Sequence, residues 1–215
     1  MTQDSLQGGS HNLDLLRAVA VLSVYSAHLS HAVGFYNAGS LGRFGVIIFF
    51  VHTSCVLMAS LERLQASGLS RLGELCRAFY LRRFFRIYPL AIFCILLVPL
   101  LQVPAHPTAD YHWIGAKALA ANLALSQNLF YASNALNVLW SLPLEVQMYL
   151  LPPLVYLFIR RYRFGALAFL GAAVIAALTL PRLSGRLGVF TFAPCFAAGV
   201  MAYFLCGESR RRLAP

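Results

Sequence analysis

The sequence has few acidic residues, no paired cysteines and none of the common nucleotide-binding or hydrolase motifs. Only seven of its 215 residues are Asp or Glu, and no GxGxxG, P-loop or GDSL-like segment is present. These absences argue against a fused second enzyme. The cysteines have no CxxC or other metal-binding spacing, so we expect free thiols that pack as small apolar residues. They are Cys55, Cys76, Cys94, Cys195 and Cys206.

Hydrophobic residues, in contrast, are abundant. They make up 60% of the chain and the mean hydropathy is +0.70, above the range of an ordinary soluble domain. Apolar runs close to the length that crosses a bilayer predict an all-α polytopic membrane protein with about six spans. The predicted spans are 13–34, 44–61, 87–103, 139–159, 164–181 and 187–206. The first run is too long for a cleaved signal peptide, so we expect it to be retained as an anchor.

The connections between these spans differ in charge. Twelve basic residues lie in 62–86, 160–163 and 210–212, and four lie in the alternate loops. This positive-inside pattern predicts that both termini are cytoplasmic. The net charge of +10 does not indicate nucleic-acid binding, because the charge follows every second loop and forms no single stripe. In the longest connection, 104–138, the stretch 114–130 has the apolar spacing of an interfacial or re-entrant helix.

Two ionisable residues, Arg17 and His28, lie within the first apolar run. Eleven helical steps place them on the same face, roughly 16 Å apart along the axis. A charged residue near the bilayer centre costs about 2.5–3.5 kcal/mol, so an intramembrane Arg usually faces protein, a partner or a water-filled cavity. The sequence therefore predicts a polar seam along the first span.

Glu145 lies at a depth similar to that of His28, in a span that runs in the opposite direction. A carboxylate and an imidazole at one depth can form a hydrogen-bonded pair if the helices touch. Ser141 and Tyr149 lie four residues either side of Glu145 and share its helical face. Trp140 and Tyr149 are also typical interfacial anchors, so a packing role is the alternative.

Arg83 and Arg86 come just before the third predicted span. Being three residues apart, they are neighbours on one helical face. A pair of guanidinium forks at a membrane surface suits phosphate oxygens. Basic residues that flank a span also set topology and meet anionic headgroups, and this alternative stays open.

Histidine spacing does not predict a metal site. His28 and His31 have the i, i+3 spacing of a ligand pair, but no carboxylate or cysteine nearby completes a set, and His52 stands alone in the second span. We therefore expect no bound metal.

Four segments carry motifs in a characteristic order. Arg17 is followed after ten residues by His28, and the second span contains a Gly-Val-x-x-Phe-Phe-Val pattern at 45–51. An Arg-x-x-Arg-x-x-Pro element occupies 83–89, and a Trp-Ser-Leu-x-x-Glu motif occupies 140–145. Together these segments resemble the acyltransferase-3 family of integral membrane acyltransferases. The second span departs from the family pattern, with Ile47 in place of a frequent Asp and 52–54 in place of Ser-Gly.

The resemblance implies a bundle of about ten helices. We expect 13–206 to be the first part of that domain, between a cytoplasmic tail at 1–12 and a basic tail at 207–215. The family transfers an acyl group, commonly acetyl, from cytoplasmic acyl-CoA to a hydroxyl of an envelope or secreted carbohydrate or glycolipid. No permanently bound cofactor is implied. The expected location is the bacterial inner membrane, in contact with membrane lipid, and an oligomer is possible.

The same resemblance assigns roles to the motif residues. His28 would be the catalytic histidine, with Arg17 as its intramembrane companion. Arg83 and Arg86 would engage the acyl donor, and Glu145 would belong to the acceptor side of the active site. The sequence does not separate a general-base role for His28 from a transient acyl-carrier role. The supporting residues are Trp140, Ser141 and Tyr149.

Two other interpretations compete with this one. A small polytopic transporter or exporter component could use the seam formed by Arg17 and His28 as a pathway. An inactive, truncated acyltransferase would retain the motifs without the whole bundle. A glycerolipid acyltransferase is not supported, because no His is followed by Asp at the required spacing. The pair formed by Arg83 and Arg86 favours the acyltransferase, because an exporter has no need to bind CoA.

Overall fold

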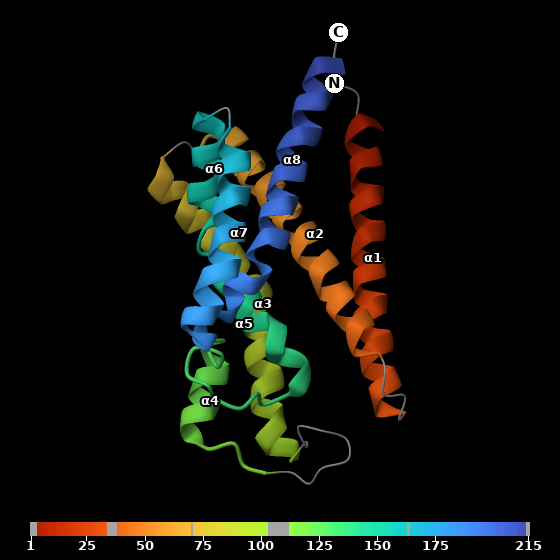
Figure 1. Cartoon of the computed structure of the whole chain (residues 1–215), viewed down its shortest axis with the longest axis vertical. Helices are drawn as coiled ribbons and strands as arrows, with labels where there is room; N and C mark the ends of the chain where they lie inside the picture. Colours follow the sequence, from red (N-terminus) through yellow and green to blue (C-terminus); the bar gives the residue numbers. More distant parts are fainter. Residues whose placement is uncertain (1–3, 34–37, 70, 103–111, 163, 214–215) are drawn as a thin grey trace.

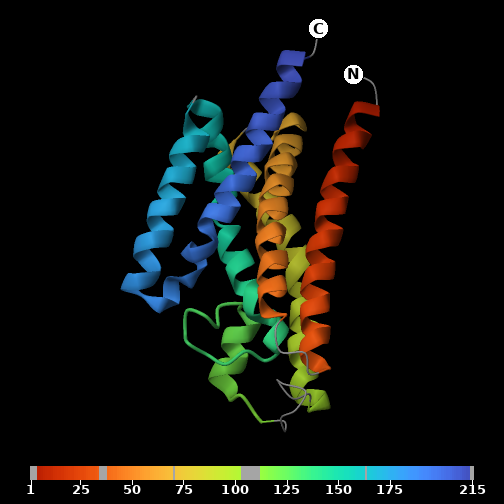
Figure 2. The same ribbon diagram turned by 45° about the vertical axis from the view of Figure 1, so that its right-hand side comes forward.

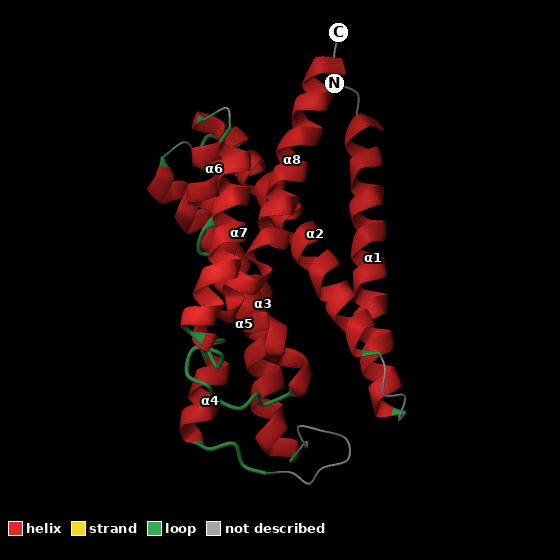
Figure 3. Ribbon diagram, in the orientation of Figure 1, coloured by secondary structure: helices red, strands yellow, loops and turns green. Residues whose placement is uncertain are grey.

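Every regular element in the described part of the chain is a helix. The computed structural model describes residues 4–33, 38–69, 71–102, 112–162 and 164–213, and no strand occurs in these ranges (Figure 3). Five helices are long and apolar enough to cross a membrane, and a bent pair makes up to six. The predicted all-α polytopic membrane fold is confirmed. The elements are α1 (Asp4–Ala32), α2 (Gly39–Ala66), α3 (Leu72–Leu101), α4 (Ala116–Leu123), η1 (Asn137–Ser141), α5 (Leu142–Met148), α6 (Pro152–Arg161), α7 (Gly165–Leu183), η2 (Gly185–Phe192) and α8 (Ala193–Leu213).

The long helices alternate in direction, so the connections gather at two ends of the bundle. Both termini and the turns from α2 to α3 and from α6 to α7 lie at one end, which we call the termini end (Figure 1). The short helix α4 and the connection from α1 to α2 lie at the opposite end, and the turned view agrees (Figure 2). The basic segments of the sequence therefore share the termini end.

Helix α2 is the centre of the bundle and packs against α1, α3, α6 and α8. Its sequence is apolar around nearly its whole circumference, which is typical of a buried helix. Side chains from α3, α5, α6 and α8 complete the core around it. The buried apolar residues that α2 contributes are Val46, Phe50, Leu57, Met58, Leu61 and Leu64.

Two glycines set the closest helix crossings. A Cβ atom at Gly45 would lie 2.7 Å from the carbonyl oxygen of Ala20 in α1, and one at Gly199 in α8 would overlap Val51 and Ser54 of α2. Small residues allow membrane helices to approach this closely, where van der Waals packing replaces the hydrophobic effect as the attraction. The position of α1 and α8 on α2 thus depends on these two residues.

The predicted boundary of the third span at 87 is wrong, because α3 begins at Leu72. The segment 62–86, expected to be a loop, is mostly helical, since α2 continues to Ala66. Leu75 and Phe79 are four residues apart and both are buried in the core, so packing extends the helix toward the termini end. Arg83 and Arg86 consequently lie inside a helix.

The fourth predicted span, 139–159, is also not a single helix. Its first half is η1 followed by α5, and its second half is α6, with a bend of 44° between the two parts. Pro152 and Pro153 follow the break. Proline lacks a backbone N–H and clashes with the preceding turn, so it suits the first turn of α6 and cannot continue α5.

The predicted interfacial helix 114–130 is shorter than expected. Only Ala116–Leu123 forms α4, and Leu125 has a left-handed backbone with φ of 49°. The side chain of Asn122, which is fully buried, hydrogen bonds to three backbone groups of α4 and of residues 133–135 at 2.8–2.9 Å. These bonds fold the chain back onto α4. The fold-back could not be predicted from Asn122 alone, because Asn is also common in turns that make no such contacts.

The remaining spans match their predictions with shifts at their ends. Helix α1 begins before the predicted 13 and ends at Ala32, and α2 extends beyond 44–61 at both ends. Helix α7 matches 164–181 closely, and η2 with α8 covers 187–206. The first part of the long connection, residues 103–111, lies outside the described residues.

We predict that Gly199→Ala destabilises the protein, because the added methyl meets backbone atoms of α2 that cannot move aside easily. Overpacking of this kind costs about 1–3 kcal/mol. Thermal unfolding in detergent measures the effect. Gly171→Ala in α7 is the matched control, since no atom lies within 4 Å of its added Cβ. Equal stability of the two variants would contradict the close crossing of α2 and α8.

Candidate active site

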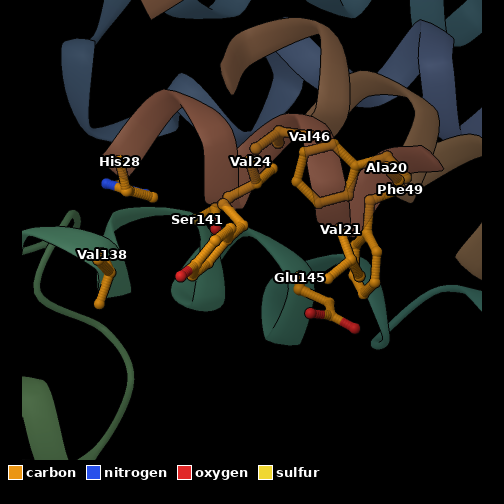
Figure 4. A pocket seen from close by; sticks show the side chains of 11 residues that line it. Ala20, Val21, Val24, His28, Val46, Phe49, Val138, Ser141 and Glu145 are labelled. Atoms are coloured by element: carbon orange, nitrogen blue, oxygen red, sulfur yellow. The ribbon is translucent and has the colours of Figure 1, made fainter. Parts of the chain in front are cut away.

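A cavity of about 460 Å³ lies between α1, α2 and the segment from η1 to α5. Its lining is mostly apolar and includes the polar side chains of His28, Ser141 and Glu145 (Figure 4). A concave apolar site with a few polar groups is the usual form of a small-molecule pocket. The other lining residues are Ala20, Val21, Val24, Tyr25, Val46, Phe49, Phe50 and Val138.

Three of the predicted site residues therefore meet in one cavity. His28 and Glu145 lie toward opposite sides of it, with Ser141 between them in this view (Figure 4). The carboxylate of Glu145 accepts a hydrogen bond from the hydroxyl of Tyr149, one turn further along the chain. No hydrogen bond joins His28 to Glu145 among the described side chains. The direct pair that a contact between the two helices would allow is absent there, and the two side chains instead line the same half-open cavity.

The basic pair of α3, Arg83 and Arg86, lies near Glu145. Arg83 is buried, and its guanidinium carbon is 5.7 Å from the ring centre of Phe79 and 5.8 Å from that of Tyr149. Both distances fit cation–π contacts. Arg83 and Arg86 also interact electrostatically with Glu145. The sequence did not indicate that Arg83 is buried, because helical spacing does not show which face of α3 packs against the other helices.

A second polar group lies next to the cavity on its termini side. His52 of α2 is 7% exposed, and the charges of Arg17 and Arg86 interact with its ring, as does that of Asp14. We call Arg17, His52 and Arg86 the polar layer. It joins residues from α1, α2 and α3. In the sequence His52 stands alone in the second span, so spacing did not indicate this grouping. Its place in the second motif helix is the feature of the sequence that could have suggested a functional role.

The polar layer and the cavity follow each other along the bundle. In α1, Arg17 comes one turn before Ala20 and Val21, which line the cavity, and in α2 His52 comes one turn after Phe49. Because α1 runs away from the termini end and α2 runs toward it, both sequence orders put the polar layer on the termini side (Figure 1). His28 lies at the far side, eleven residues beyond Arg17.

The segment that carries Glu145 is held from both sides. Trp140 packs with its ring centre 6.2 Å from that of Phe192, away from the cavity lining. Asn128 and Gln147 exchange two side-chain amide hydrogen bonds, of 3.1 and 2.7 Å, and so fasten the loop after α4 to α5. These contacts fix α5 at the cavity although it is only seven residues long.

No group of three or more His, Cys, Asp or Glu side chains that could hold a metal ion occurs in the described part of the chain. The side chain of His31 lies outside the described residues. All five cysteines are free thiols.

Comparison with protein families identifies the family of this chain. The model of the acyltransferase-3 family, described as an acyltransferase domain, matches residues 10–212. The chain belongs to the acyltransferase-3 family. The resemblance based on the four motifs is thus confirmed over nearly the whole chain, and the multi-pass membrane character agrees with it. No solved structure matches the chain significantly.

Two curated relatives of this acyltransferase-3 protein are similar in sequence. Peptidoglycan O-acetyltransferase OatA of Listeria monocytogenes is 30% identical over 157 residues, which are 66% of this chain and 23% of OatA. YrhL of Bacillus subtilis, whose name assigns it provisionally to the same activity, is 31% identical over 179 residues, 78% of this chain and 26% of YrhL. The matched segments therefore span about a quarter of each relative.

We predict that Tyr149→Phe destabilises the protein by about 1–3 kcal/mol, because the half-buried carboxylate of Glu145 loses its hydrogen bond to the buried Tyr149. Thermal unfolding in detergent is the measurement. Tyr162→Phe is the control, because Tyr162 is exposed and its ring contacts that of Phe158 on the same helical turn. If Tyr149→Phe and Tyr162→Phe were equally stable, the hydrogen bond between Tyr149 and Glu145 would not contribute to the stability of the protein.

Proposed function

We propose that this protein is a membrane O-acyltransferase that moves an acyl group, acetyl in the first instance, from acyl-CoA to a hydroxyl of an envelope carbohydrate. The observation that carries the proposal is the shared cavity of His28, Ser141 and Glu145, with the arginines of α1 and α3 on its termini side. Family membership supports the reaction class over the exporter hypothesis.

The donor would enter from the termini end. That end carries the basic segments, which the positive-inside rule assigns to the cytoplasm, where acyl-CoA is found. Arg83 and Arg86 lie between the termini end and Glu145, and a guanidinium group binds phosphate or carbonyl oxygens through charge-assisted hydrogen bonds. Because Arg83 is buried under Phe79 and Tyr149, we assign the donor's phosphates to the exposed Arg86 and a positioning role to Arg83.

The acceptor would enter from the opposite end, where His28 lies. The two relatives named as peptidoglycan O-acetyltransferases support a carbohydrate acceptor, and we propose a peptidoglycan hydroxyl as the first candidate. Tyr25, Ser141 and Glu145 offer hydroxyl and carboxylate groups on the cavity wall that can hydrogen bond to a sugar.

The reaction then follows from the position of the imidazole. His28 removes the proton from the acceptor hydroxyl as its oxygen attacks the thioester carbonyl, and the C–S bond breaks. The same proton passes from the imidazolium to the departing thiolate, which leaves as CoA thiol. Arg17 can stabilise the oxyanion, while Glu145 across the cavity balances the charge on the ring. A variant in which His28 first accepts the acyl group uses the same residues.

We predict that His28→Ala lowers acetyl transfer by about 10²–10⁴-fold, because either version of the mechanism needs the imidazole. The measurement is transfer of labelled acetyl from acetyl-CoA to peptidoglycan fragments by the full chain in proteoliposomes. His112→Ala is the control, since that exposed histidine lies outside the cavity lining. Undiminished transfer by a folded His28→Ala protein would exclude the proposed role. A folded wild type without any transfer would favour the inactive, truncated alternative.

A further inference from the structure

His52 carries a buried polar atom with no partner in the described part of the protein. The residue is 7% exposed, and its Nδ1 atom has no hydrogen bond there. A buried donor or acceptor without a partner costs about 1–3 kcal/mol. Packing alone does not account for a histidine at this position, because an apolar ring of similar size would avoid that cost.

The surroundings of His52 indicate what kind of partner fits. Its ring centre is 6.5 Å from that of Phe49, which lines the cavity, and the charges of Arg17, Asp14 and Arg86 act on it. His52 therefore lies in the polar layer, one helical turn from the cavity wall and on the side of the termini end. The polar layer thus lies between the basic end of the bundle and the cavity.

The proposed donor has a group that can lie in this layer. The pantetheine arm of acyl-CoA is a narrow chain with two amides between the phosphates and the thioester. If Arg86 binds on the phosphate side and the thioester reaches the cavity, the amides lie in between. An amide offers both an N–H donor and a C=O acceptor, so it satisfies a ring nitrogen in either tautomer.

We propose that His52 is a further binding residue for the acyl donor, and that its Nδ1 hydrogen bonds to an amide of the pantetheine arm. This inference rests on the proposed function, since it takes acyl-CoA as the donor. His52 positions the arm and takes no part in proton transfer. It therefore governs the affinity for the donor and leaves the chemical step to the cavity residues.

The test compares two substitutions that differ in where they keep a polar atom. His52→Phe keeps a ring and removes both nitrogens, whereas His52→Asn keeps an amide group near the position of Nδ1. We expect His52→Phe to raise the KM for acetyl-CoA about tenfold, the effect of one hydrogen bond, with kcat nearly unchanged. His52→Asn should recover most of the affinity. Thermal unfolding of each variant verifies that it is folded.

A binding experiment separates this inference from the activity itself. Equilibrium binding of labelled acetyl-CoA to the full chain in detergent is measured with two competitors, S-acetylpantetheine and adenosine 3′,5′-bisphosphate. We expect His52→Phe to weaken competition by the pantetheine fragment and to leave that by the nucleotide fragment unchanged. Equal loss for both fragments, or no loss for either, would overturn the role of His52. If the wild type binds acetyl-CoA and transfers nothing, the proposed function fails while the binding role is still measured.

Discussion

The arrangement of this protein depends on the cost of placing ionisable side chains within apolar spans. Arg17, His52, Arg83, Arg86 and Glu145 lie on four helices that otherwise suit a lipid environment. A single charge at the bilayer centre costs about 2.5–3.5 kcal/mol on insertion scales, so such groups are retained where protein or enclosed water surrounds them. Here they interact with one another across α1, α2, α3 and α5. Three of these helices, α1, α2 and α5, also line the cavity.

An apolar cavity beside a charged layer suits transfer between two compartments. Under the proposed function, the lining of valine, alanine and phenylalanine would surround the thioester with apolar groups, and a low dielectric would strengthen the few polar contacts there. Tyr149 connects the two regions, because its hydroxyl bonds to Glu145 and its ring packs on Arg83. A change at Arg83 can therefore reach Glu145 through one side chain.

Much of the fold could be predicted from the sequence, because long apolar runs and alternating basic loops are strong signals. The predicted helix boundaries were wrong where tertiary packing or proline determines where a helix begins or ends. Leu75 and Phe79 extend α3 beyond its apolar run, and Pro152 with Pro153 divides the fourth span. In the site, helical spacing correctly related Ser141, Glu145 and Tyr149. It could not show which groups from different helices meet, so the separation of His28 from Glu145 and the burial of Arg83 emerge only in three dimensions.

The central claim is that donor and acceptor reach one cavity from opposite ends of the bundle. Proteoliposomes in which a C-terminal tag reports the orientation of each molecule test this directly. Acetyl-CoA is supplied on one side and the carbohydrate acceptor on the other, and transferred acetyl is counted. The account predicts transfer only when acetyl-CoA is on the side of the tag. Transfer that is equal or greater when acetyl-CoA is on the side opposite the tag would contradict it.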